Sequence, residues 1–188
     1  MFALNPIWHG DRTVNKVAIT FDDGPKPGHA TAILDILHKY SVKANFFVVG
    51  QSIEKYPDLV YQIHNQGHEL ANHSYSHRPL TSLSRTQLER EFYETNRLIK
   101  DITNTKVSFF RPPGGKYDWR VLRMAKKHGL KTIFWDINPG DYVIASSHFQ
   151  LHILIQEYGM SHYLLVWEML LCLLLIKKIS QVIMYKNQ

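Results

Sequence analysis

Apolar and polar residues follow two different periods along the first three quarters of the chain. Five short apolar runs have the length and composition of buried strands, at 17–21, 45–50, 68–74, 107–110 and 131–137. The segments between them place apolar residues three and four positions apart, which is typical of amphipathic helices. Strands that alternate with helices in this way predict an α/β fold with a parallel sheet, either a barrel or an open doubly wound sheet.

The helical segments also carry residues that begin and end helices. Pro57 suits the first turn of a helix that stops at Gly67. Ser84 followed by Gln87 is a capping-box pattern, and Asp118 can cap a further helix. These local signals support the alternation read from the apolar pattern, and no internal repeat or linker divides it into two domains.

Polar residues able to do chemistry follow the predicted strands at their carboxyl ends. Two follow the first strand, two the third and one the fourth, and they are Asp22, Asp23, His73, His77 and Arg111. In a parallel α/β barrel this is the face where catalytic groups converge. We therefore expect side chains that are far apart in sequence to share one pocket.

The adjacent carboxylates in "AITFDDGP" (18–25) need an explanation. Asp22 and Asp23 repel when both are ionised, so a folded site needs a cation, an arginine or a shared proton to hold them. The alternative is a solvated turn, because Asp, Gly and Pro commonly terminate strands.

The segment "HSYSH" supplies two histidines four positions apart. On a helical turn, His73 and His77 would project from the same face and could reach one metal ion. The alternative is a pair of exposed or capping histidines. Together with one aspartate they make three ligands and leave a coordination position for water, which is typical of catalytic metal sites. The second aspartate would then stay free as a base.

The segment "RPPGG" (111–115) adds a permanent cation. Arg111 can hold a carboxylate in a two-pronged hydrogen bond. Pro112 and Pro113 stiffen the loop, and Gly114 leaves its backbone N–H open to a ligand. The alternative is a plain connection rich in turn residues.

The three segments "TFDDGP", "HSYSH" and "RPPGG", in this order, resemble the first three motifs of the NodB-like polysaccharide deacetylases, the family four carbohydrate esterases. The resemblance implies a distorted (β/α) barrel. It runs from about Lys16 to Tyr142, so we expect a catalytic domain over 16–142. A short lead over 1–15 would precede this domain, and an atypical apolar tail over 143–188 would follow it.

The resemblance also implies a role for each matching residue. Asp22 would be the general base, and Arg111 would orient it. The metal ligands would be Asp23, His73 and His77. Zinc is the default ion for such a ligand set, and iron, cobalt and nickel also suit it.

The remaining matches concern the substrate side of the site. Gly114, where many members carry tyrosine, would offer its N–H to the oxyanion, next to Pro113. "WDINPGDY" resembles the fourth motif, in which Asp141 matches and Tyr142 replaces the usual tryptophan. The implied reaction is hydrolysis of an acetamide on an N-acetylglucosamine polysaccharide, either peptidoglycan or a chitin-like polymer, with release of acetate.

The fifth family motif, Leu-x-His, does not occur after Tyr142. Its histidine would be the general acid, held by Asp141. The nearest match is "MSH", which makes His162 a weak candidate, and His148 and His152 are weaker still. A degenerate protein that binds metal and sugar without effective turnover is therefore a second hypothesis. A metal amidohydrolase with a small substrate also stays open.

The tail after Tyr142 is unusual in composition. Its block "YLLVWEMLLCLLLI" (163–176) has 14 residues and contains Glu168, so it is shorter than the roughly 20 residues that span a bilayer. It can instead be a buried helix or a strand pair that closes the barrel. A third interpretation is a tail foreign to the family, as from a shifted reading frame. The abrupt end of the resemblance favours the third.

Composition adds limits on partners. The 188 residues fall in the range of one domain, and the net charge of +6 suits an anionic surface. No nucleic-acid motif is present, so we do not expect nucleic acid as a partner. The apolar block is too short to make a membrane the expected partner. The single Cys172 excludes an internal disulfide. The first 16 residues lack the pattern of a secretory signal, although the family mostly acts outside the membrane, so the compartment stays open.

Overall fold

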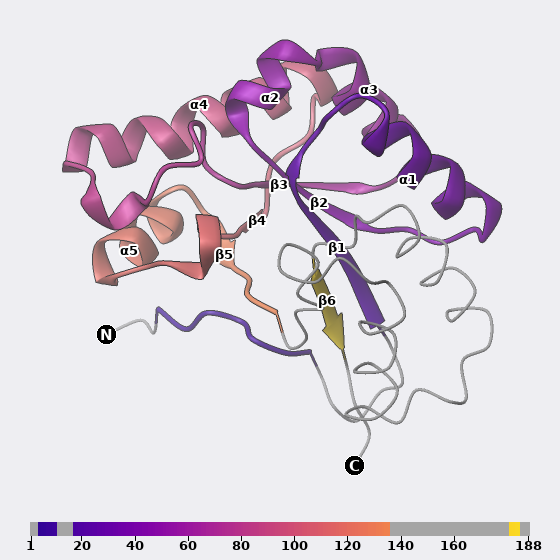
Figure 1. The fold of residues 1–188 in the computed structure, drawn as a ribbon. Helices are drawn as coiled ribbons and strands as arrows, with labels where there is room; N and C mark the ends of the chain where they lie inside the picture. The colour runs from indigo at the N-terminus through magenta and orange to yellow at the C-terminus, as the bar shows by residue number, and fades with distance from the viewer. Residues whose placement is uncertain (1–3, 11–16, 136–180, 185–188) are drawn as a thin grey trace.

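The computed structural model describes residues 4–10, 17–135 and 181–184. Their strands form one sheet in the order β5-β4-β3-β2-β1-β6 (Figure 1). The strands are β1 (Val17–Gly24), β2 (Asn45–Val48), β3 (Glu69–Asn72), β4 (Phe109–Phe110), β5 (Lys131–Thr132) and β6 (Gln181–Met184). β1 to β5 are parallel, which confirms the predicted α/β class.

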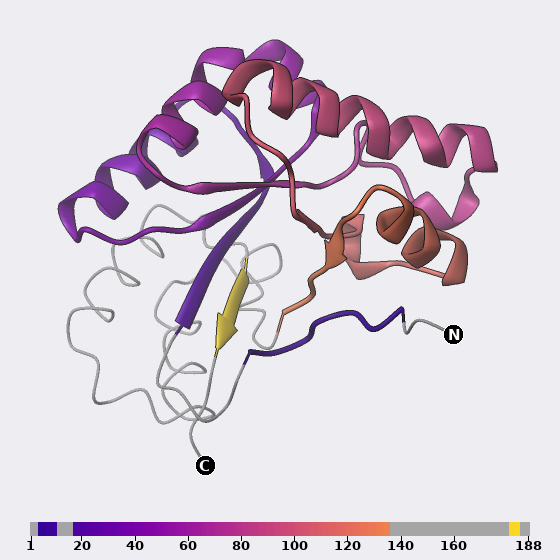
Figure 2. The same ribbon diagram turned by 180° about the vertical axis from the view of Figure 1, so that it is seen from behind.

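Helices connect the parallel strands. They are α1 (His29–Lys39), α2 (Gly50–Lys55), α3 (Pro57–Asn65), α4 (Arg85–Thr103) and α5 (Trp119–Lys127), with short 3₁₀ turns η1 (Leu80–Ser82) and η2 (Pro113–Gly115). Figures 1 and 2 show α1 to α4 gathered over one side of the sheet, with β6 lying away from them and the N-terminal segment running beside α5 and β5. The two sides of the sheet therefore have different surroundings.

Alternation along the strands separates two layers of packing. Ile19, Phe21 and Phe46 belong to the main core under the helices. Phe47 and Ala71 belong to a smaller cluster on the opposite side. Because successive strand residues point to opposite faces, side chains at the strand ends can point away from the main core.

The predicted helix ends are confirmed. The Ser84 hydroxyl accepts a hydrogen bond from the N–H of Gln87, whose side chain accepts one from the N–H of Ser84. Asp118 accepts hydrogen bonds from two N–H groups in the first turn of α5, and Pro57 is the first residue of α3. The caps fix where α4 and α5 begin, and so fix the loops that precede them.

Several predicted bounds were too long. The runs 45–50, 107–110 and 131–137 contain strands of four, two and two residues. The run 45–50 stops early because α2 begins at Gly50. A Cβ atom at Gly50 would lie 2.4 Å from the ring of Tyr75, so glycine is required there by packing. The sequence pattern missed α2, because six residues are too few to display a helical period.

β6 is a strand that the sequence pattern did not predict. It lies in the expected tail and pairs antiparallel with β1, with Thr20 facing Gln181. A strand from the tail therefore extends the sheet. No helix among the described residues is long and apolar enough to cross a membrane, and the apolar block 163–176 lies outside them.

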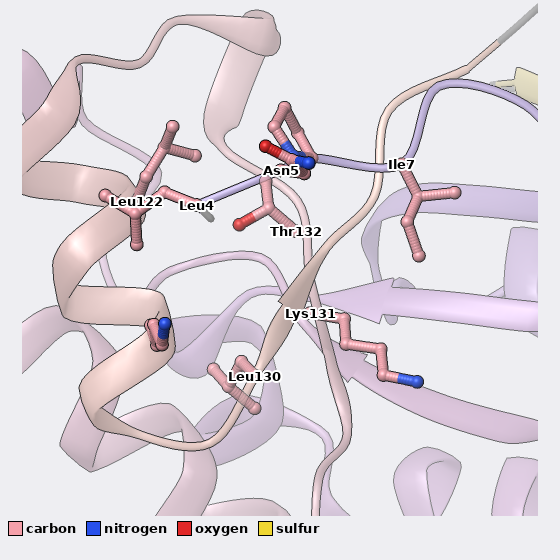
Figure 3. Close-up of a pocket in the computed structure, with 9 residues that line it drawn as sticks. Leu4, Asn5, Ile7, Leu122, Leu130, Lys131 and Thr132 are labelled. Carbon is pink, nitrogen blue, oxygen red and sulfur yellow. The ribbon is translucent and has the colours of Figure 1, made fainter. Parts of the chain in front are cut away.

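The N-terminal segment covers the β5 end of the sheet. Ile7 donates a backbone hydrogen bond to the carbonyl of Thr132 and accepts one from the N–H of Phe134, both at 2.8 Å. The ring of Trp8 stacks on that of Phe134, with centroids 4.0 Å apart. A cavity of about 330 Å³ lies between this segment, α5 and β5 (Figure 3).

Candidate active site

The carboxyl ends of β1, β3 and β4 bring the predicted residues together. Asp22 and Asp23 lie at the C-terminal end of β1, His73 directly follows β3, and Arg111 directly follows β4. Contacts of 3.9 Å or less link the side chains of all four, and Nδ1 of His73 also contacts the backbone carbonyl of Arg111. The expected convergence at one edge of the sheet is therefore found.

Asp23, His73 and His77 form a compact group of possible metal ligands. The Oδ1 atom of Asp23 lies 2.9 Å from Nε2 of His77 and 3.3 Å from Nε2 of His73. One ligand atom from each residue lies within 4.8 Å of the others. Two imidazoles and one carboxylate are a donor set that suits zinc and related divalent ions.

The hydrogen bonding of His73 supports a cation at this position. Its Nδ1 lies 2.8 Å from the carbonyl oxygen of Arg111, which can only accept, so Nδ1 carries a hydrogen. In the neutral ring, Nε2 then directs a lone pair toward the Asp23 carboxylate. Two electron-rich atoms face each other favourably only with a proton or a cation between them. The residues present therefore fit a metal ion.

The same contacts shift the pKa values of the group. The contacts with His73 and His77 hold the pKa of Asp23 well below its usual range, despite partial burial of the carboxyl. The hydrogen bond to Asp23 in turn raises the pKa of His77. Asp23 is therefore ionised over the whole neutral range, as a metal ligand must be.

The predicted helical turn at 73–77 is wrong. These residues are not helical, and Ser74 and His77 have positive φ angles of 66° and 57°. The Ser74 hydroxyl accepts a hydrogen bond from the N–H of His77 at 3.1 Å. The two histidines reach Asp23 through a tight loop, whose left-handed residues are uncommon outside glycine and need support from their surroundings.

Glu91 of α4 supplies that support, and sequence reasoning missed it. One carboxylate oxygen accepts hydrogen bonds from the N–H groups of Tyr75 and Ser76, both at 2.8 Å, and the other accepts from the Ser76 hydroxyl at 2.6 Å. Glu91 is buried. A charged residue between Leu88 and Thr95 on the apolar face of a predicted helix was the signal that could have found it.

Arg111 holds the first aspartate of the pair. Its Nη1 donates to Oδ1 of Asp22 at 2.7 Å and to the hydroxyl of Thr20 at 2.9 Å. Its other nitrogens donate to the carbonyls of Ile133 and Phe134. The expected two-pronged contact with the carboxylate is therefore a one-pronged contact, because the remaining donors bind the backbone.

Burial makes the contact between Arg111 and Asp22 strong. Arg111 is completely buried, with its guanidinium 3.9 Å from the centre of the Phe47 ring. Burial lowers the pKa of Arg111, and the charge of Asp22 opposes that shift. An ion pair in such surroundings is screened far less by water than one at the surface.

The two adjacent carboxylates thus have different surroundings. The side chain of Asp22 is 7% exposed and faces a permanent cation, whereas that of Asp23 is 55% exposed and faces two histidines. Oδ2 of Asp22 lies 3.9 Å from Nε2 of His73. The pair therefore sits at one site with separate partners, which explains how two like charges are tolerated side by side.

The RPPGG loop forms part of the rim. Pro113 is buried, whereas Gly114 is exposed, and a Cβ atom at Gly114 would have no neighbour within 4 Å. Gly115 has φ +68° and approaches Trp135 so closely that a Cβ atom would lie 2.7 Å from its ring. Open space therefore lies beside Gly114, while Gly115 is required by packing and by its backbone conformation.

Three predicted site residues cannot be compared with this arrangement. Asp141, Tyr142 and His162 lie outside the described residues. Their assigned roles stay predictions.

Comparison with known proteins agrees with this geometry. A peptidoglycan-N-acetylglucosamine deacetylase of Bacillus cereus is 34% identical over 128 residues, which are 68% of this chain and 60% of the relative. A chitooligosaccharide deacetylase of Sinorhizobium fredii is 36% identical over 127 residues, or 67% of this chain and 59% of the relative. The chain thus spans about three fifths of the length of these two relatives.

A solved structure extends the likeness to the fold. A CE4 family pseudoenzyme from Bacillus anthracis has a TM-score of 0.81 and 25% identity, and covers 94% of this chain and 65% of its own. Its likeness agrees with the barrel type that the motifs imply. Residues 9–133 also match the family model described as polysaccharide deacetylase. On this evidence the chain belongs to the polysaccharide deacetylase family.

Proposed function

We propose that this chain is a metal-dependent hydrolase that removes N-acetyl groups from an N-acetylglucosamine polysaccharide and releases acetate. The observation that carries the proposal is the pairing of Asp22 with the buried Arg111, directly beside the Asp23, His73 and His77 cluster. A poised base next to a group of metal ligands is the arrangement that hydrolysis of an amide requires.

The metal would be held by Asp23, His73 and His77, and zinc is the default ion for this ligand set, with cobalt or nickel as substitutes. Such an ion supplies Lewis-acid chemistry, polarising a carbonyl group and lowering the pKa of a bound water. The half-exposed carboxyl of Asp23 and the partly exposed ring of His77 leave the cluster accessible from solvent.

Asp22 would take the proton from the attacking water. Its Oδ1 accepts the hydrogen bond from Arg111, and its Oδ2 lies 3.9 Å from Nε2 of His73, on the side of the possible metal ligands. Arg111 would orient the carboxylate. Gly114, with Pro113 beside it, would donate its N–H to the oxyanion that develops on the acetyl group.

The departing nitrogen needs a proton when its bond to the acetyl carbon breaks. Asp141 with His162 is the assignment that the motif comparison offers for this step, and Tyr142 would line the substrate side. Without a general acid the rate would fall by about 100- to 10,000-fold. The step is therefore the one on which turnover by this chain depends.

A second candidate function is sugar and metal binding without turnover. The observation that favours it is the likeness to a CE4 family pseudoenzyme, together with the missing Leu-x-His motif. A mutant of a pseudoenzyme with restored activity is equally similar in structure, with a TM-score of 0.81. Small changes to a fold of this type can therefore separate the two functions.

The deciding experiment measures acetate release from an N-acetylglucosamine hexamer and from peptidoglycan. Protein stripped of metal would be assayed before and after reloading with zinc or cobalt. Release that depends on the added metal is the expected result and supports the hydrolase. Stoichiometric metal binding with no release from either substrate would overturn the hydrolase proposal and favour the binding protein.

A further inference from the structure

A basic groove lies between α4 and α5, which lie beside each other in both ribbon views (Figures 1 and 2). It has a volume of about 210 Å³. Its cationic lining residues are Arg85, Arg120, Arg123 and Lys127, and it contains no carboxylate. We call this the basic groove. It is separate from the cluster of possible metal ligands and takes no part in the steps above.

The carboxylates nearest the basic groove are already engaged. Asp118 accepts hydrogen bonds from the first turn of α5 and pairs with Arg120. Glu89 pairs with Lys127. Arg85 and Arg123 are exposed, and within the described part of the chain neither has a carboxylate at ion-pair distance. The basic groove therefore keeps positive charge that no carboxylate of the described residues neutralises.

The wall of the basic groove is held in place by Arg120. Its guanidinium donates to the backbone carbonyls of Thr81 at 2.6 Å and Leu83 at 3.1 Å, in addition to its pair with Asp118. These contacts tie the start of α5 to the segment before α4. A surface already rigid in the free protein loses less conformational entropy when it binds a ligand.

The aromatic surface at this groove is unusually exposed. Trp119 lines it and is 63% exposed, the largest value among the exposed large apolar side chains that the structure describes. The guanidinium of Arg123 lies 5.4 Å from the centre of its ring. A flat apolar ring flanked by a cation suits a partner that has both an apolar face and negative charge.

The basic groove is also close in sequence to the candidate active site. Trp119 is the first residue of α5 and follows Arg111 after only the short rim loop that contains Gly114. The volume of about 210 Å³ lies below the roughly 300 to 1,000 Å³ of pockets that enclose a whole small ligand. The basic groove therefore has room for one section of a longer chain, which would extend beyond both ends of the groove.

We infer that the basic groove binds a carboxylate-bearing section of the polysaccharide, outside the reacting centre. A sugar ring lies on Trp119, and carboxylates of the stem peptide that the polysaccharide carries face Arg85 and Arg123. The inference rests on the proposed function and narrows its substrate from N-acetylated polysaccharides in general to anionic ones of the peptidoglycan type. A single aromatic ring and a short run of cations do not make the repeated stacking track that single-stranded nucleic acids use.

Binding can be measured without turnover. The Asp22→Asn protein would be titrated with soluble peptidoglycan fragments that carry stem-peptide carboxylates, and with a neutral N-acetylglucosamine hexamer. The test variant adds Arg85→Ala and Arg123→Ala, and a second variant adds Trp119→Ala. The matched control adds Lys39→Ala and Lys55→Ala, which remove the same charge from exposed positions on α1 and α2. Alanine favours helix, so the helices are expected to stay folded.

The anionic fragments are expected to bind more tightly than the hexamer, and increasingly so as the salt concentration falls. The double arginine variant should lose about 3- to 10-fold in affinity for the anionic fragments and less than twofold for the hexamer, with the lysine control unchanged. Trp119→Ala should also weaken binding of the fragments.

Equal affinity of the double arginine variant and its parent would overturn the inference, as would a preference for the neutral hexamer. A single-stranded oligonucleotide that binds the basic groove more tightly than the fragments would overturn it in favour of nucleic acid. Because the readout is binding by a variant without the proposed base, its failure is distinct from absence of deacetylase activity.

Discussion

Arg111 connects the chemistry of the candidate site to its stability. This completely buried side chain binds Asp22, Thr20 and two backbone carbonyls of the segment after β5. Removal of one partner from a buried ion pair leaves an uncompensated charge, which costs about 3 to 5 kcal/mol. The residue that would orient the base is therefore also one that the folded state needs.

Substitution of Asp22 and substitution of His73 should separate the chemistry from metal binding. Asp22→Asn keeps the size of the side chain and removes the base, so acetate release should fall by about 100- to 10,000-fold while zinc binding persists. His73→Ala removes a ligand and should lose both. Acetate assays and zinc titrations distinguish these results, and undiminished release by Asp22→Asn would refute the assigned base.

His68 should make stability depend on pH. Burial, with a smaller contribution from the charge of Lys43, lowers its pKa from 6.5 to about 4. Its Nδ1 accepts a hydrogen bond from the N–H of Ala44, and its buried Nε2 has no partner among the described residues. Between pH 6.5 and about pH 4, His68 binds a proton in the unfolded chain and stays neutral in the folded chain. Stability should therefore fall from about pH 6.5 to pH 4, by at most about 3 kcal/mol.

Urea unfolding of the parent and of His68→Leu across this pH range tests the prediction. The free energy of unfolding of the variant should depend less steeply on pH, because the group that titrates only when unfolded is gone. The exposed His38→Asn is the control and should keep the slope of the parent. Parallel curves for the parent and His68→Leu would contradict the assignment.

At the scale of elements, α4 positions the candidate metal ligand His77 through one residue. Glu91 holds the loop that carries His77, in which two residues have left-handed backbone angles. The predicted capping box fixes the start of α4, so the position of Glu91 along the helix is set by local sequence. A helix on the outside of the sheet thus positions side chains at its edge.

Glu91→Gln should weaken metal binding more than it weakens the fold. The amide keeps the shape but turns one acceptor into a donor, which faces N–H groups of the loop or the Ser76 hydroxyl. Loss of such support typically costs about 10- to 100-fold in metal affinity. Zinc titration of the variant is the measurement, and Glu94→Gln, which removes a surface ion pair on the same helix, is the control. Unchanged zinc affinity in Glu91→Gln would exclude a positioning role.

Elements and motifs were predictable to different degrees. Strand positions along the chain and helix caps follow from local patterns, so β1 to β3, α3, α4 and α5 were found near their true positions. The contact between Arg111 and Thr20 joins residues 91 positions apart, and no spacing rule could reveal it. The loop at His73 to His77 was misread because its support comes from Glu91, which lies on a different element. Local sequence specified the elements, whereas tertiary contacts specified the site.

At the scale of the whole molecule, the N-terminal segment is part of the folded unit. The backbone of Ile7 forms hydrogen bonds next to β5. The ring of Trp8 packs on Phe134, whose carbonyl accepts a hydrogen bond from Arg111. Trp8 is thus three contacts away from Asp22, through Phe134 and Arg111. The periodic pattern could not show this, because the pairing is an isolated bridge and not a strand.

Trp8→Ala should therefore destabilise the fold despite partial exposure. Trp8 is 45% exposed, so the expected loss is about 1 to 2 kcal/mol, below the 3 to 5 kcal/mol of a fully buried aromatic side chain. Urea unfolding measures it. Tyr93→Ala, which removes a ring that is 54% exposed on α4, should cost no more than about 0.5 kcal/mol. Equal stability of both variants would show that the segment does not stabilise the sheet.

The pairing of β1 with β6 also determines how late in synthesis of the chain this edge of β1 can be paired. Thr20 faces Gln181, so the two strands are separated by about 160 residues of chain. At roughly 5 to 20 residues per second, a ribosome needs about 8 to 30 s between completing the first strand and delivering the second. During that interval one edge of β1 offers unpaired backbone groups, the template from which aggregation begins. Nascent chains of this protein should accordingly depend on chaperones for longer than proteins whose edge strands pair with near neighbours.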